Sequence, residues 1–266
     1  MKDFTLGKYR ELLVALKRSG RSFLAFEDYC DARRNNTLPT NFAILRHDVD
    51  LKAANSLRTA QIEHELGIRA SYYFRIVPQS NCPDIIRQIA SLGHEIGYHY
   101  EDMSIMGGDV EMAIEHFGRQ LAYFRQYYPV RTVCMHSALT SRFDGRDLWK
   151  KYNYRDFGIV GEPYFDTDFS SMLYLTDTGR CWDGYKVSVR DKIAMQDEWV
   201  RRGWVFHSTD DIISRLAQDT DNALRTVMFT THPQRWTDNT AEWMKERIMQ
   251  SIKNRIKRIM IWSKEY

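Results

Sequence analysis

The chain has 266 residues, a formal net charge of +3 and an apolar share of 43%. This length suits one large domain or two small ones, and the apolar share is ordinary for a globular protein with a sizeable core. A net charge this small argues against nucleic acid as a partner, because such binding depends on an excess of positive charge.

The four cysteines are widely spaced and none forms a C-x-x-C pair, which argues against a cysteine zinc site. The N-terminal segment is charged and amphipathic, unlike a signal peptide. No stretch approaches the roughly 18 apolar residues of a membrane span. We therefore expect a reduced, cytoplasmic protein without a transmembrane segment, and peripheral membrane contact stays open.

In chain order, apolar periodicity and turn residues predict strands and helices that alternate. The first half gives a helix from residue 6 to a stop at Gly20, a strand over 42–46, a helix over 53–68, a strand over 70–76, a helix over 82–93 and a strand over 94–99. The second half gives a helix over 109–128, a strand over 131–137, a short helix over 146–152, strands over 156–161 and 172–178, a helix over 209–218 and a last strand over 226–232.

This alternation is typical of a parallel α/β sheet or barrel, in which every junction from strand to helix lies on the same face. The sequence contains no internal repeat and no long linker. We therefore predict an α/β fold with a single domain over 1–266, a core over about 40–236, and a basic amphipathic helix over 237–266.

Polar side chains collect where the predicted strands end. The segment RHDVD, Arg46 to Asp50, follows the apolar run of the strand over 42–46, and Asp48 and Asp50 point the same way if the segment is extended. Later strands end near His99, at His136 and at His232. Histidines and carboxylates that converge from separate strands are what a divalent metal site needs, so we predict such a site at this face.

Three motifs, HDVD, GHEIGYHYEDM and TTHPQRW, together resemble those of the polysaccharide deacetylase (NodB-homology) superfamily over about residues 40–236. The resemblance implies a distorted (β/α) barrel with a divalent metal, most often zinc, and a metal-bound water. It also implies that Asp48 is the general base, Asp50 and His99 are metal ligands, and His232 is the general acid.

The chain departs from this family at two places. Met103 stands where the second metal histidine is expected, and the arginine-proline motif after the fourth strand is absent. A catalytic zinc normally has three protein ligands, so a third is needed beside Asp50 and His99. His136 is the first candidate and Glu101 the second.

The resemblance implies a metal-dependent hydrolase that removes an N-acyl group from an amino sugar or a surface-polysaccharide precursor. HDVD with HYED is similar to a subgroup associated with O-antigen and related biosynthesis. The substrate's carrier, a nucleotide or a lipid, stays open. Besides the catalytic and metal residues, the candidate substrate-binding residues are Arg46, Glu101, Tyr100, Trp182 and Arg235.

Two other functions compete with this hypothesis. A barrel without a metal that binds a glycan or a nucleotide-sugar is consistent with Met103 and the missing motif. A hydrolase of cyclic amides is the weaker option. At the residue level, Asp48 and Asp50 are alternatively caps of the helix that follows, and His47 and His94 are interpreted as structural.

The segment over 237–266 carries an apolar stripe, Ile248, Ile252, Ile256 and Ile259, opposite a basic face of Lys253, Arg255, Lys257 and Arg258. The favoured interpretation is that the stripe packs on the barrel. Contact with an anionic membrane surface and a dimer contact are the alternatives.

Overall fold

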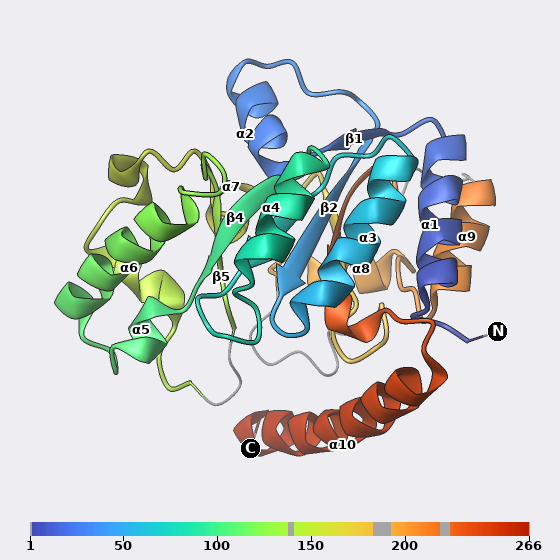
Figure 1. Ribbon diagram of the computed structural model, residues 1–266. Helices are drawn as coiled ribbons and strands as arrows, with labels where there is room; N and C mark the ends of the chain where they lie inside the picture. Colours follow the sequence, from blue (N-terminus) through green and yellow to red (C-terminus); the bar gives the residue numbers. More distant parts are fainter. Residues whose placement is uncertain (1, 138–140, 183–192, 219–223, 266) are drawn as a thin grey trace.

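The computed structural model describes residues 2–137, 141–182, 193–218 and 224–265 (Figure 1). In these ranges the strands are β1 (Ser22–Leu24), β2 (Phe42–Val49), β3 (Ser71–Phe74), β4 (Glu95–Tyr100), β5 (Val133–Met135), β6 (Leu173–Thr176) and β7 (Thr226–Thr231). The α-helices are α1 (Leu6–Arg18), α2 (Phe26–Arg34), α3 (Ala53–Glu65), α4 (Pro83–Ser91), α5 (Asp102–Ile105), α6 (Val110–Phe124), α7 (Pro163–Asp166), α8 (Gln196–Arg201), α9 (Thr209–Gln218) and α10 (Thr240–Glu265). Short 3-10 helices are η1 (Gly145–Lys150), η2 (Tyr154–Phe157) and η4 (Pro233–Arg235).

The strands form one parallel sheet in the order β5-β4-β3-β2-β7-β6, and β1 pairs with the first half of β2. The sheet curls into a half-barrel, which confirms the predicted parallel α/β class. Helices α3 and α4 pack against each other, and α1 packs against both α3 and α9 (Figure 1). Because all strands run the same way, their carboxyl ends meet at one edge of the sheet.

Alternation along β2 sends neighbouring side chains to opposite faces of the sheet. His47 points to the helix side, where its ring bonds to Glu63 of α3, whereas Arg46 and Asp48 share the other face and bond to each other. In β4, Gly97 gives room on this second face, because a Cβ there would lie 2.3 Å from Cε1 of Tyr73. The missing side chain lets the Tyr73 ring fit below the polar residues at the strand ends.

The structure differs from the predicted elements in several places, and the short helices α5, α7 and α8 were not predicted. The predicted strand over 156–161 is wrong: η2 occupies its start, and Gly161 makes only an isolated bridge to Thr132. The pair β1 and α2 was not predicted. The strand β1 has only three residues, which is too short for a clear alternating pattern. Helix α2 is capped through Asp28 and not by an N-cap side chain, so the sequence pattern that marks a helix start is weak there.

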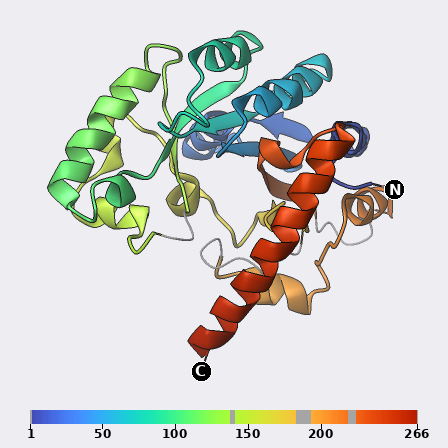
Figure 2. The ribbon, with the colours of Figure 1, turned by 60° about the horizontal axis from the view of Figure 1, so that its bottom comes forward.

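The helix predicted over 237–266 is present as α10, but the interpretation that its stripe packs on the barrel is wrong. Ile248, Ile252, Ile256 and Ile259 are 50–67% exposed. The helix is instead seated by its other side, where Trp243 donates to the carbonyl of Asp3. Figures 1 and 2 show α10 outside the layer of helices, on the side of the molecule to which β2 points.

No helix within the described ranges is long and apolar enough to cross a membrane.

Candidate metal centre

Three side chains from three strand ends converge on one point at the carboxyl edge of the sheet. Oδ1 of Asp50 lies 3.1 Å from Nδ1 of His136 and 3.5 Å from Nε2 of His99, and the two ring nitrogens are 3.3 Å apart. The structure thus brings together the two ligands that the family motifs suggest and the substitute expected for the missing histidine.

Oδ1 of Asp50, Nε2 of His99 and Nδ1 of His136 form a triangle, and its size fits a bound metal ion. Ligands held about 2.0–2.1 Å from a tetrahedral zinc lie about 3.3 Å from one another. Oδ1 of Asp50 is buried yet makes no hydrogen bond among the described residues. A buried carboxylate oxygen left without a partner is costly, and a bound cation removes that cost. These residues can hold a metal ion.

Second contacts fix the two imidazole rings. Nδ1 of His99 lies 2.9 Å from the carbonyl of Cys134, which can only accept, so this nitrogen carries a proton and Nε2 faces Asp50. Behind His136, Glu101 lies 3.9 Å from Nε2 and is held by Arg75 through two bonds of 2.8 Å. Glu101, the second candidate for the third ligand, therefore lies behind His136 and is paired with a guanidinium.

Asp48 lies on one side of the triangle and is held by Arg46. The guanidinium donates to both carboxylate oxygens, at 2.9 and 2.6 Å, and both side chains are buried. Burial favours the neutral acid, but the charges of Arg46, His99 and His232, together with the hydrogen bonds from Arg46, outweigh it and lower the pKa of Asp48. Asp48 is therefore an ionised carboxylate, 3.9 Å from Nε2 of His99.

His232 lies on the other side, with Nε2 3.8 Å from Oδ2 of Asp50. Its Nδ1 lies 2.6 Å from Oδ1 of Asp177, and its backbone N–H donates to the other oxygen of the same carboxylate at 2.9 Å. Arg235 and Trp236 also donate to Asp177, at 2.5 and 2.8 Å. Burial alone would raise the pKa of Asp177, but Arg235 and His232 lower it to about 2. Nη1 of Arg235 also lies 2.7 Å from Nδ1 of His232. Because Nδ1 is turned toward Asp177, Nε2 faces the triangle.

Sequence reasoning missed Asp177. It follows β6 directly, and its backbone N–H bonds to Thr230 of β7. The available signal was a carboxylate at the end of a predicted strand, the same signal used for Asp48 and Asp50. Gln234 was also missed, and its amide lies 3.4 Å from Oδ2 of Asp50.

Two of the residues expected to bind substrate are core residues instead. Tyr100 is fully buried between the rings of Phe117 and Trp149. Trp182 is 3% exposed and donates its indole N–H to Thr209. Neither ring has a free face on which a sugar could stack, so these two predictions are wrong.

Tyr164 lies beside Arg46, the residue that holds Asp48. Its ring centre is 5.4 Å from the guanidinium carbon of Arg46 and 5.5 Å from that of Arg146. Arg46 and Arg235 are both paired with carboxylates next to the triangle, Asp48 and Asp177.

The alternative in which the two aspartates cap the next helix is excluded. Helix α3 starts at Ala53, and its N-cap is Lys52 in a left-handed conformation with no side-chain cap. His94 is structural as expected, since its two nitrogens bond to the backbone of Ala70 and Ala60.

A second group that can hold a metal consists of Asp48, His99 and Cys134. It shares His99 with the triangle, but Asp48 is already held by Arg46 through two bonds. The unpartnered oxygen of Asp50 therefore favours the set Asp50, His99 and His136.

Comparison of the chain with family models and with curated proteins gives no match.

Proposed function

We propose that the protein is a metal-dependent amide hydrolase that removes an N-acyl group from an amino sugar or a surface-polysaccharide precursor. The fold that we propose is a distorted barrel of the polysaccharide deacetylase type. The observation that carries the proposal is the unpartnered oxygen of Asp50, which faces two imidazoles between an ionised carboxylate and a carboxylate-bound histidine.

Asp50, His99 and His136 would hold the cation. One aspartate and two histidines are ligands that zinc prefers. A divalent ion bound there would acidify a water molecule and polarise an amide carbonyl. This set leaves further coordination positions for water and substrate, as a catalytic site requires.

Asp48 is the general base in this proposal. Its carboxylate is ionised because Arg46 is fixed beside it, and it lies at the edge of the triangle. Arg46 holds the carboxylate in one orientation through two parallel bonds, which directs its remaining lone pairs toward the site. Asp48 accepts the proton of the attacking water.

His232 is the general acid. Asp177 accepts from Nδ1, so the ring presents Nε2 to the site and holds its proton there when the imidazole is charged. Asp177 also stabilises that charge. His232 gives the proton to the amine that leaves, and the free amino sugar and a short carboxylic acid are the products.

The sugar part of the proposal is supported by the resemblance of the three motifs, HDVD, GHEIGYH and TTHPQRW. The partly buried ring of Tyr164 beside Arg46 is a candidate surface for a sugar to stack on.

The experiment is a hydrolysis assay on zinc-loaded and cobalt-loaded protein with a panel of N-acetylated and N-formylated amino sugars, free, nucleotide-linked and lipid-linked. The released acid is followed by NMR and the free amine by a fluorogenic reagent. Asp48→Asn and His232→Ala should lose at least about 100-fold in rate. His64→Gln, an exposed histidine on α3 that bonds to the Leu92 carbonyl, is the matched control and should keep the rate.

Release of acid by wild-type protein, lost in the two site variants and kept in the control, supports the proposal. Metal bound at one equivalent with no acid released from any sugar contradicts it. A panel of cyclic ureides run in parallel separates that outcome from hydrolysis of a cyclic amide.

A further inference from the structure

The outer face of α10 is an apolar surface without a partner in the described structure. We call this face the α10 stripe: six large side chains that are 45–67% exposed, Met244, Ile248, Met249, Ile252, Ile256 and Ile259. Their spacing of three, four and seven residues places them on one side of the helix. A contiguous exposed apolar patch of this kind marks a site of interaction, whereas exposed apolar residues that are scattered singly do not.

The opposite side of α10 holds the helix on the body of the protein with polar contacts. Asn254 donates to the carbonyl of Gly179 at 2.9 Å and accepts from Gln250 at 2.8 Å. Trp243 and Gln250 are 6% and 4% exposed. These contacts hold the polar side of α10 on the body of the protein, so its apolar side faces outward.

Basic side chains border the α10 stripe. Exposed lysines and arginines of the helix are Lys245, Arg247, Lys253, Arg255 and Arg258. The acidic residues of the same helix are Glu242, Glu246 and Glu265. Arg247 and Arg255 line a groove of about 320 Å³ together with Ile248 and Ile252, so the positive charge adjoins the stripe itself.

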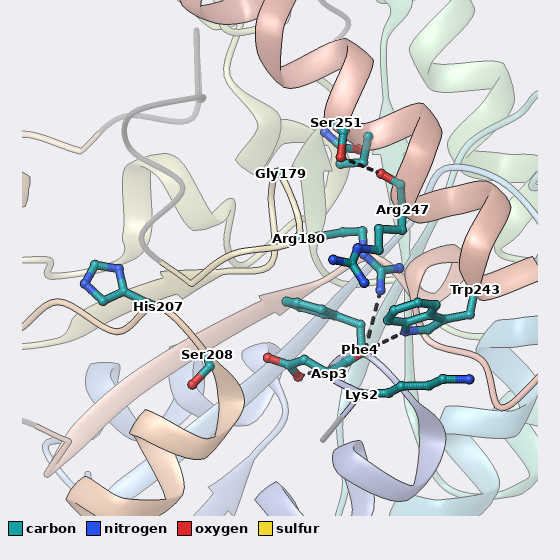
Figure 3. Close-up of a pocket in the computed structure, with 11 residues that line it drawn as sticks. Lys2, Asp3, Phe4, Gly179, Arg180, His207, Ser208, Trp243, Arg247 and Ser251 are labelled. Carbon is teal, nitrogen blue, oxygen red and sulfur yellow. Dashed lines mark hydrogen bonds between the residues drawn. The ribbon is translucent and has the colours of Figure 1, made fainter. Parts of the chain in front are cut away.

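More positive charge lies at the root of the helix, in a cavity of about 460 Å³ (Figure 3). Figure 3 shows Arg180 and Arg247 close to the ring of Trp243, and their guanidinium carbons are 5.1 and 5.2 Å from its centre. Lys2 lies 5.4 Å from the same ring. Within the described ranges, none of these three cations forms an ion pair with a carboxylate.

We propose that α10 is a docking helix for an anionic lipid surface, with the α10 stripe in the acyl region and its lysines and arginines at the head groups. An amphipathic helix with an apolar face and basic borders binds in the plane of such an interface. The helix lies on the side of the molecule to which β2 points, so docking would hold the candidate metal centre toward the membrane side (Figure 1).

Charge favours a lipid surface over a second copy of the chain. Two stripes packed against each other would bring the basic borders of both helices together, and like charges repel. Negative head groups neutralise the same borders.

The test is sedimentation of the full-length protein with vesicles of phosphatidylcholine alone and of phosphatidylcholine with about one third phosphatidylglycerol. We expect binding to the anionic vesicles at least about tenfold tighter than to the neutral ones, and weakened by 0.5 M NaCl. The variant Ile252→Asp/Ile256→Asp should lose at least about tenfold in binding. Ile105→Asp, at a 42% exposed isoleucine of α5, is the matched control and should bind as wild type does.

Equal binding to both vesicle types, binding to neither, or binding that survives in the double variant would overturn the proposal. Light scattering on the same proteins without vesicles tests whether the stripe instead binds a second copy of the chain. A wild-type dimer that becomes monomeric in Ile252→Asp/Ile256→Asp would assign the stripe to that second copy. The stripe lies outside the metal centre, so loss of vesicle binding with unchanged metal content is independent of the proposed hydrolysis.

Discussion

Two buried clusters of histidines and carboxylates lie on opposite faces of β2, and only one of them is suited to bind a metal. On the helix side, Glu63 accepts from Tyr9, Tyr72 and His47 at 2.5–2.7 Å, and the other nitrogen of His47 meets Thr231 at 2.7 Å. We call this the Glu63 cluster.

In the Asp50 cluster, which consists of Asp50, His99 and His136, the three side chains lie 3.1–3.5 Å apart, and Oδ1 of Asp50 makes no hydrogen bond among the described residues. Both clusters therefore have histidines next to a carboxylate. The difference is that both oxygens of Glu63 accept hydrogen bonds from protein groups, whereas Oδ1 of Asp50 accepts none within the described residues and can take a bound cation. Residue types alone do not distinguish a structural cluster from a site, but unfilled hydrogen-bonding capacity does.

The largest expected effect is at the general base. Asp48→Asn should lower the rate of acid release by about 10²–10⁴-fold, because the amide cannot accept the proton of the attacking water. Its metal content should stay that of wild type, since Asp48 lies outside the triangle. Kinetics and metal analysis of one preparation test both points. A variant with an unchanged rate removes Asp48 from the chemistry.

Substitution in the Glu63 cluster should lower the stability of the protein and leave its metal content unchanged. Glu63→Ala leaves the buried donors of Tyr9, Tyr72 and His47 without their acceptor, and we expect it to lower the free energy of unfolding by about 3–5 kcal/mol. Urea unfolding at pH 7 measures this loss. The folded fraction should bind metal normally. If Glu63→Ala instead lost the metal and kept its stability, the contrast between the two clusters would be wrong.

Asp177→Asn should act on His232 without touching the metal. The anion that fixes Nδ1–H and stabilises the charged ring is removed, so we expect a loss of rate on the order of 100-fold. Kinetics and urea unfolding of the same preparation measure the two effects separately. A loss of rate explained wholly by a smaller folded fraction would make Asp177 a purely structural residue.

The smallest effect is a change in the pH dependence of stability at the amino end of the sheet. Burial, with the charge of Glu27 added, raises the pKa of Glu95, so the folded protein holds a proton that the unfolded chain has released. Stability is therefore fully present below the ordinary glutamate pKa of about 4.5 and falls as the pH rises from there through the folded pKa.

Glu95→Gln keeps partners in Ser71 and Thr132 but cannot titrate. Its unfolding free energy should fall less steeply with pH, by up to about 1.4 kcal/mol per pH unit. Guanidinium unfolding at intervals between pH 5 and 8 measures this slope. Parallel curves for variant and wild type would show that Glu95 does not hold the proton.

The parallel class of the fold was predictable because the strands over 42–46, 70–76 and 226–232 are apolar runs bounded by turns and helical patterns. The convergence of Asp50, His99 and His136 was also predictable, since carboxyl ends of parallel strands meet at one edge. The fold class and the convergence of these three residues depend on local sequence pattern and on topology, so a single sequence was enough to predict them.

The remaining features depend on packing, which no local pattern contains. Tyr100 follows a strand end and looks available for a sugar, but its place in β4 points it to the helix side, where Phe117 and Trp149 cover it. The orientation of α10 is decided by Trp243 and Asn254, two contacts to distant segments, against the general tendency of an isoleucine stripe to pack inward.

The most direct measurement is the metal content of purified protein by mass spectrometry after dialysis against zinc. Wild type, Asp50→Ala and His136→Ala should be compared with His64→Gln as the exposed-histidine control. The account predicts about one zinc per chain in wild type and control and less than about one tenth of that in the two site variants. Absence of zinc from wild type, or equal zinc in all four proteins, would contradict the assignment of the Asp50 cluster as a metal centre.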